Sequence, residues 1–291
     1  MKVLFVGVFE KSRKSTNTSQ ILSFKKIGCE VTGYNYRSRA LKIGNHERDR
    51  EMVSIVKERA FDLVVFSKCN VVSAEVFSEI SRYTKTCLWF MDPLMSYDEE
   101  MRSKTALVNY FCCDKSNVLD EAKKYNQMSF QVCEGYDSDV DYPWDKEVHK
   151  KYEVSFIGSV YGDRSKIIQS ITAPVKLISG VYGRDHAKAV AESKINLNLS
   201  TSSGASDRVY KVLASGGFLL TNDWVGRKKH FKDGKDLVIF NTIEDLNKKI
   251  KIFLQDEELR RSIAASGRQS VRGLDRDSWA KEIIRLYEQT K

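Results

Sequence analysis

The sequence predicts an α/β protein made of two Rossmann-like domains with a cleft between them. Short apolar runs alternate with amphipathic helical segments along the whole chain. Several of these runs are continuously apolar, which is typical of parallel strands covered by helices on both faces. The alternation breaks once, in the polar and acidic stretch DSDVDYPWDKE at residues 137–147. A chain of 291 residues is long for one open sheet and sufficient for two α/β domains.

The first domain is assigned to residues 1–140, followed by a linker at residues 141–151. We predict its strands at residues 3–8, 30–34, 63–67, 86–91, 108–112 and 129–133. Helical patterns lie between these runs, at residues 15–27, 48–60, 74–83 and 116–125. The opening run MKVLFVGVF has no small-residue cleavage site after it and is followed directly by charged residues. We therefore interpret it as the first strand and not as a signal peptide.

The second domain is assigned to residues 152–274. Its predicted strands lie at residues 154–157, 175–179, 195–199, 218–221 and 237–240. Its predicted helices lie at residues 164–171, 185–193, 207–214, 244–254 and 257–271. We expect residues 275–291 to form a final helix that packs back toward the first domain.

Composition indicates a globular chain, with 42% hydrophobic residues and 3 prolines. No apolar run is long enough to span a bilayer. The 6 cysteines show neither C-x-x-C nor Cys/His ligand spacing, so buried thiols in a cytoplasmic protein of a bacterium or a phage-infected host are expected. The formal net charge of +9 has two open interpretations. It favours polyanionic or anionic partners, or it reflects lysine on exposed helix faces.

The segment SDRVYKVLASGGFLLTN at residues 206–222 predicts a short helix, a Gly216-Gly217 break and an apolar strand. Arg208 and Lys211 fall on one face of the first helical turns. A helix N-terminus with added cations favours a phosphate group. The alternative is an ordinary surface helix capped by glycine, with Ser206 and Asp207 as its N-terminal cap.

A similar arrangement occurs upstream, in GSVYGDRSK at residues 158–166. A strand leads through Gly158 into a helix that opens with Arg164 and Lys166. This segment fits a second phosphate anchor. A plain strand-to-helix loop with surface charges is the alternative.

The second half resembles the nucleotide-sugar domain of GT-B glycosyltransferases, and within them the group related to the spore-maturation protein CgeB. The resemblance is carried by VSFIGS (154–159) with Arg164, SKINLNLS (193–200), residues 206–222, FKDGKDLV (231–238), and a Leu-x-Asp-x-x-x-Arg pattern within residues 243–267. It covers nearly all of residues 152–290. The first half resembles the family through its strand rhythm and WFMDP at residues 89–93. The resemblance implies a metal-independent enzyme without a cofactor, whose donor substrate is a nucleotide-diphosphate sugar.

The donor site implied by the resemblance includes Gly158, Arg164, Lys166, Arg208 and Lys211, which would hold the diphosphate. Two tyrosines have open roles. Tyr182 either stacks on the nucleotide base or fills a loop, and Tyr210 either lines the donor pocket or packs in the core.

One departure concerns Lys211. Many GT-B enzymes have at this position a glutamate that binds the donor ribose. A lysine only donates hydrogen bonds and accepts none from ribose hydroxyls. The ribose contact is therefore expected to differ, or Lys211 has moved to phosphate binding.

For the general base we favour Asp92, which ends an apolar strand and precedes Pro93. Strand carboxyl ends face the ligand side of such sheets, so its carboxylate can meet an acceptor hydroxyl. The alternative is a turn residue, or one that only orients the substrate if the enzyme retains anomeric configuration. Lys11, Arg13 and Lys14 follow the first strand and form either an acceptor-side wall for an anion or a solvated basic turn.

The functional hypothesis is a nucleotide-sugar-dependent glycosyltransferase. Two acceptors stay open: a hydroxylated base of phage DNA, and a saccharide or cell-surface polymer. A non-catalytic nucleotide-sugar or nucleic-acid binding protein is a third possibility, motivated by Lys211. A dehydrogenase is disfavoured because Gly-x-Gly-x-x-Gly is missing after the first strand.

Overall fold

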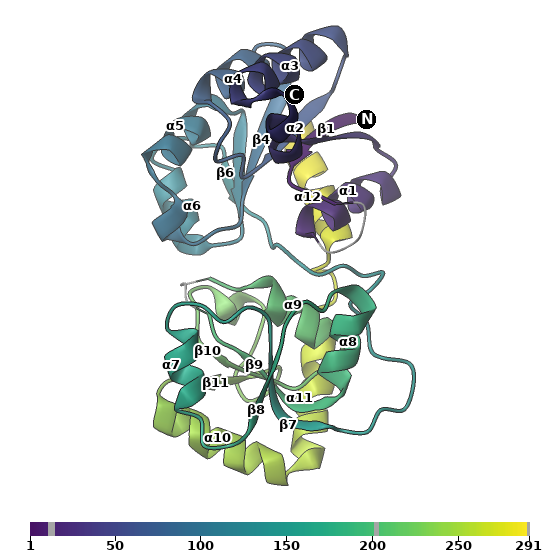
Figure 1. Ribbon diagram of the computed structural model, residues 1–291, viewed down its shortest axis with the longest axis vertical. Helices are drawn as coiled ribbons and strands as arrows, with labels where there is room; N and C mark the ends of the chain where they lie inside the picture. The colour runs from purple at the N-terminus through teal and green to yellow at the C-terminus, as the bar shows by residue number, and fades with distance from the viewer. Residues whose placement is uncertain (11–14, 201–203, 290–291) are drawn as a thin grey trace. The chain divides into compact units, whose positions relative to one another are not determined.

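The structure is a computed structural model that describes residues 1–10, 15–200 and 204–289 (Figure 1). The chain divides into two units. Unit 1 consists of Met1–Glu134 and Arg276–Lys291, and unit 2 consists of Gly135–Asp275. Each unit contains one parallel β-sheet with helices on both faces. Among the described residues, no helix has the length and apolar character needed to cross a membrane.

The sheet of unit 1 has six strands in the order β2-β1-β3-β4-β5-β6. The strands are β1 (Lys2–Gly7), β2 (Glu30–Asn35), β3 (Leu63–Ser67), β4 (Lys85–Phe90), β5 (Tyr110–Cys113) and β6 (Ser129–Gln131). The helices are α1 (Thr16–Lys26), α2 (Tyr36–Ile43), α3 (Asn45–Glu58), α4 (Ala74–Ile80), α5 (Glu99–Leu107), α6 (Ser116–Ala122) and α12 (Arg276–Gln289), with a 3₁₀ turn η1 (Leu94–Ser96).

Alternate residues of these strands pack into two cores. Leu4 and Val6 of β1 face the core beneath α3, α4, α5 and α6, whereas Val3 and Phe5 face the core beneath α1 and α12. Burial on both faces explains why these strands are continuously apolar in sequence.

The last helix, α12, belongs to unit 1. Its Trp279 ring meets the rings of Phe24 and Trp89 edge-on, at centroid distances of 5.3 and 5.4 Å. Asp277 in its first turn accepts an ion pair from Lys26 at 2.6 Å. The helix therefore closes one of the two cores of unit 1.

The sheet of unit 2 has five parallel strands in the order β11-β10-β9-β7-β8. The strands are β7 (Tyr152–Ile157), β8 (Val175–Ile178), β9 (Ser193–Asn198), β10 (Leu219–Asn222) and β11 (Val238–Phe240). The helices are α7 (Arg164–Gln169), α8 (Gly183–Ala191), α9 (Asp207–Ala214), α10 (Ile243–Gln255) and α11 (Glu257–Ser270), with a 3₁₀ turn η2 (Arg227–Lys229). Within this unit α8, α9 and α11 cover one face of the sheet, and α7 and α10 cover the other (Figure 1).

Candidate functional site

The carboxyl edge of the unit 2 sheet gathers the residues of the two phosphate-anchor motifs. β7 ends at Ile157 and leads through Gly158 to α7, and β9 ends at Asn198 and leads to α9. Ligands of open α/β sheets bind outside this edge, where the following helices also present their N-termini.

Arg208, in the first turn of α9, reaches back over the ends of two strands. Its Nε donates to the Ile157 carbonyl at 2.7 Å, and its Nη1 donates to Asn198 Oδ1 at 2.8 Å. The guanidinium lies 4.4 Å from the centroid of the Phe156 ring. Burial lowers the pKa of Arg208 from 12.5 to about 10, because a buried cation loses its hydration. The side chain is thus a desolvated cation held by neutral oxygen atoms.

Arg164, at the start of α7, is a second buried cation of the same kind. It is 5% exposed, and its Nε and Nη1 donate to the carbonyls of Leu199 at 2.8 Å and Ser159 at 3.0 Å. Its guanidinium lies 5.6 Å from the Phe156 ring centroid. The charge of Arg164 also contributes to the lowered pKa of Arg208. Within the described ranges, neither guanidinium forms an ion pair with a carboxylate, so the two create a local positive potential.

Gly158 makes the close approach of Arg208 possible. A Cβ atom at this position would lie 2.4 Å from Nη2 of Arg208, and the backbone φ is +145°. Both the space and the backbone conformation therefore require glycine here. Nη2 of Arg208 has no hydrogen-bond partner among the residues described, and it lies beside this glycine.

Lys211 forms an ion pair within α9 one turn from Asp207, with Nζ and Oδ2 2.5 Å apart. The side chains are 24% and 34% exposed, respectively. His186 on α8 is buried, and its Nδ1 has no hydrogen-bond partner in the part of the chain that the structure describes. The pKa of His186 is lowered from 6.5 to about 3, mainly by burial and also by the charges of Lys211 and Arg208, which Asp207 opposes. The imidazole is therefore neutral at ordinary pH.

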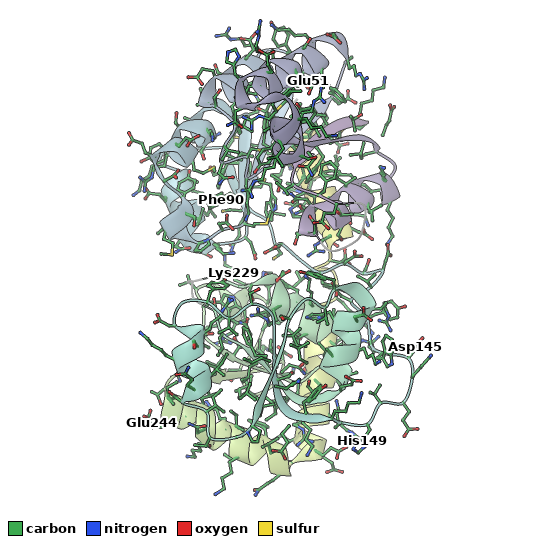
Figure 2. All side chains as sticks on the ribbon, in the orientation of Figure 1. Glu51, Phe90, Asp145, His149, Lys229 and Glu244 are labelled. Carbon is green, nitrogen blue, oxygen red and sulfur yellow. The ribbon has the colours of Figure 1, made fainter. Side chains whose placement is uncertain are left out.

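His186 is expected to make unit 2 sensitive to acid. The pKa is lower in the folded state than the unfolded value of 6.5, so the stabilisation is complete above pH 6.5 and is lost as the pH falls toward 3. When the pH is lowered from 7 to 5, the free energy of unfolding should fall by about 2 kcal/mol less in the His186→Leu variant than in the wild type. Urea unfolding at the two pH values measures this difference. His149→Gln is the control, since His149 is exposed (Figure 2) and its replacement should leave the pH dependence unchanged.

The other predicted donor residues differ in how far they are exposed. The Lys166 side chain is 84% exposed and pairs with Asp163 at 3.5 Å. Tyr182 is 47% exposed and directly precedes α8. Tyr210 is 2% exposed, and its ring lies 6.3 Å from that of Phe231, as the core interpretation predicts. The structure therefore brings together Gly158, Arg164 and Arg208, with Lys211 on the same helix as Arg208.

In unit 1, Asp92 lies just beyond the carboxyl end of β4. Its Oδ1 accepts from Lys68 Nζ at 2.6 Å, and both side chains are 35% exposed. The carboxylate is thus held in place and remains accessible to a ligand. Lys11, Arg13 and Lys14 lie outside the described residues.

Unit 2 also contains a cavity of about 380 Å³ at the amino ends of its strands. It is lined by several cations, among them Lys150 and Arg260. Lys150 donates to the carbonyls of Ala191 and Ser193, and Arg260 to those of Phe253 and Leu254. These cations already cap backbone oxygen atoms, so the cavity is a weaker candidate for the donor than the carboxyl edge.

Comparison with known proteins shows that the residues of this site lie in a segment that matches a protein family. Residues 143–285 match the model of a protein family described as glycosyl transferase-like. The fold is similar to that of Anabaena HepE, solved with UDP-glucose, with a TM-score of 0.73, 11% identity, and 99% of this chain and 100% of that chain covered. Residues 143–285 thus match a glycosyl transferase-like family, and the whole chain has the GT-B fold. No protein with a curated description matches it by sequence.

Two further solved structures share the fold of this chain. Sucrose-phosphate synthase from Thermosynechococcus elongatus has a TM-score of 0.72 and 11% identity, with 99% of this chain and 98% of that chain covered. A glycosyltransferase from Rickettsia africae has a TM-score of 0.70 and 9% identity, again covering 99% of this chain and 98% of that chain. In the described part of the chain, no three His, Cys, Asp or Glu side chains are grouped as a metal site would require.

Sequence reasoning did not identify several residues that shape the site. Asn198 bridges Arg208, Ser206 and Thr221 through its side-chain amide. Its signal was the alternation of asparagine with apolar residues in INLNLS. The burial of His186 had no sequence signal, since a histidine on a helix has many structural uses.

Proposed function

We propose that this glycosyltransferase transfers a sugar from a nucleotide-diphosphate sugar to an acceptor hydroxyl. The proposal depends on one observation, the pair of buried guanidinium groups of Arg164 and Arg208 that share the Phe156 ring. Two desolvated cations without a carboxylate partner are costly unless an anion compensates them. A diphosphate supplies that anion, and it gains charge as the leaving group in the transition state.

The fold supports a uridine diphosphate sugar as the first donor to test, because HepE has been solved with UDP-glucose and with UDP and glucose. We further propose that transfer needs no metal ion. Fixed guanidinium groups can stabilise the diphosphate charge that a metal would otherwise neutralise. Activity in the presence of EDTA tests this point. Among GT-B enzymes we place the chain near the CgeB-related group, on the motifs of residues 154–159 and 206–222.

Asp207 is the residue that we propose for the donor ribose. Lys211 donates only, but its ion pair holds the Asp207 carboxylate at the first turn of α9. This carboxylate is 34% exposed and follows the carboxyl edge of the sheet. It can accept hydrogen bonds from ribose hydroxyls one helical turn before the usual glutamate position.

Asp207→Asn is expected to weaken UDP binding about 10- to 100-fold, because a hydrogen bond to a carboxylate contributes about 1.5–3 kcal/mol. Calorimetric titration with UDP and with its 2′- and 3′-deoxy analogues measures the effect. The wild type should bind at least one deoxy analogue more weakly than UDP, whereas the variant should bind that analogue and UDP almost equally. If the wild type and Asp207→Asn show the same preference for UDP over the deoxy analogues, another residue contacts the ribose.

The acceptor has two candidate classes. The net charge of +9 favours hydroxylated bases of DNA, whose binding should weaken steeply with salt. A saccharide or cell-surface polymer is the alternative, with no such salt dependence. For either acceptor we propose Asp92 as the general base, with its carboxylate positioned by Lys68.

A metal-free thermal-shift panel of nucleotides and nucleotide sugars tests the donor site first. A ligand that binds only the folded protein raises its melting temperature by mass action. Stabilisation by one nucleotide family, followed by transfer to an acceptor, supports the proposal. Stabilisation without turnover on any acceptor would favour a non-catalytic binding protein. No stabilisation at all would contradict the donor site.

A further inference from the structure

Unit 1 contains a polar cavity of about 290 Å³ beside Asp92, which we call the β3–β4 pocket. Its lining residues are Lys68, Asn70, Phe90, Asp92, Ser96, Asp98, Glu100, Met101 and Lys104. The pocket lies beyond the carboxyl ends of β3 and β4, the ligand-binding edge of an open parallel sheet. Its volume equals that of roughly ten water molecules. A ligand of the size of one sugar residue fits this space.

The loop after β3 that forms one wall is fixed by a buried lysine. Lys104 on α5 is completely buried, and its Nζ donates to the carbonyls of Cys69 and Asn70, at 3.1 Å each. Its third partner is Glu100, at 2.6 Å. Lys68 and Cys69 have φ values of 61° and 56°, a conformation that few non-glycine residues adopt. The ammonium group therefore stabilises this uncommon loop conformation through two backbone hydrogen bonds.

The pocket presents donors and acceptors of hydrogen bonds close together. Asn70 Oδ1 accepts from Tyr36 and Arg37, at 3.2 Å each, and its Nδ2 donor group has no partner among the residues described. Asp92 uses Oδ1 for Lys68, which leaves Oδ2 to accept from a ligand. Phe90, labelled in Figure 2, supplies an apolar wall at the end of β4.

The charges of the pocket decide which ligand it suits. The carboxylates of Asp92, Asp98 and Glu100 outnumber the ammonium groups of Lys68 and Lys104. A DNA acceptor carries about one negative charge per 1.7 Å of helix axis, and the surplus carboxylate repels it. A hydroxyl group both donates and accepts, so it matches Asp92 Oδ2 and Asn70 Nδ2 together without a charge penalty.

We infer that the β3–β4 pocket binds a neutral, hydroxyl-rich saccharide, and that this saccharide is the acceptor. The inference rests on the proposed function, since it names the acceptor class for the transfer. Lys68, Asn70 and Ser96 bind and orient the saccharide, and Asp92 meets one of its hydroxyls. The phosphate groups of a nucleic acid have no place in this pocket.

The test uses the full-length protein with UDP-glucose as the donor probe and a panel of neutral glycosides of glucose, galactose and N-acetylglucosamine as acceptor probes. Oligonucleotides that contain 5-hydroxymethylcytosine form the competing panel. Saturation-transfer NMR and UDP release measure binding and turnover. We expect at least one glycoside to bind and to accelerate UDP release, and the oligonucleotides to do neither.

Two variants locate the binding. Lys68→Met removes the ammonium group, and Ser96→Trp fills the pocket from an exposed position. Each should raise the KM for the glycoside at least about 10-fold, while the Kd for UDP stays within about twofold of the wild type. Lys57→Met is the matched control, because Lys57 is a partly exposed lysine of unit 1 that is paired with Glu79 outside the pocket.

The outcomes separate the two proposals. Failure of UDP to bind would contradict the donor site and with it the proposed function. Three results would overturn the saccharide pocket alone, provided that UDP binds normally. They are that no glycoside binds, that sugar is transferred to the oligonucleotides, or that the glycoside KM is unchanged in both variants. Loss of glycoside binding in both pocket variants, but not in Lys57→Met, supports the inference.

Discussion

Replacement of Arg208 by alanine is expected to lower the rate of sugar transfer at least about 100-fold, because it removes a fixed cation from the proposed diphosphate site. It should also lower the free energy of unfolding by about 3 kcal/mol. The side chain is partly buried, and its loss removes the donor of the Ile157 carbonyl and one of the two donors of Asn198 Oδ1. The motif alone suggested an effect on activity with the fold intact. The buried contacts add the expected cost in stability.

The two effects of Arg208→Ala are separated by assaying transfer at a temperature at which circular dichroism shows the variant to be folded. The Kd for UDP, measured by calorimetry under the same conditions, should rise together with the loss of turnover. Arg261→Ala is the control in unit 2, because Arg261 is 79% exposed and pairs only with Glu257. Transfer at the wild-type rate by folded Arg208→Ala protein would remove the diphosphate role from this residue.

Asp92→Asn is expected to reduce kcat about 100- to 10,000-fold if the carboxylate is the general base. The Kd for UDP should not change, since the donor is assigned to residues of unit 2. Stability should change by less than about 1 kcal/mol, because the ion pair with Lys68 is partly exposed. Single-turnover kinetics with UDP-glucose and a productive acceptor measures the rate of transfer.

The anomeric configuration of the product makes the Asp92 experiment decisive. NMR of the product shows whether transfer inverts or retains the configuration, and a base is required only for inversion. Asp120→Asn, on the exposed side of α6, is the matched control and should transfer at the wild-type rate. An inverting enzyme whose Asp92→Asn variant keeps its rate within about threefold would show that Asp92 only forms the turn before Pro93.

Sequence patterns predicted most of the secondary structure but missed some helices. The continuously apolar run at residues 63–67 is β3 with the same bounds, because both faces of that strand are buried. α2 was missed since only Tyr36 of its eight residues is buried, so its sequence has no apolar stripe. α5 was missed for a related reason, because one of its buried residues is Lys104, which a pattern of apolar residues does not include.

The candidate donor site was only partly predictable. The order of glycine and cations marked Arg164 and Arg208, because a strand, a glycine turn and a helix form a local unit that sequence can specify. The hydrogen bonds that hold the two guanidinium groups join residues far apart in the sequence. Arg164 donates to Leu199, 35 residues along the chain, and Arg208 donates to Ile157, 51 residues away. Lys166 and Tyr210 fitted the same local patterns, and only the structure shows that Lys166 is exposed and Tyr210 buried.

The sequence by itself determined the α/β class, the parallel strands and the helices with apolar stripes, because hydrophobic periodicity is a local property of the chain. The sequence also contains the motifs that resemble those of glycosyltransferases. Only the tertiary structure decided that two arginines share the Phe156 ring and that Lys104 contacts the loop beside Asp92. Burial and charge pairing depend on which distant segments the sheet brings together, so no local pattern contains them.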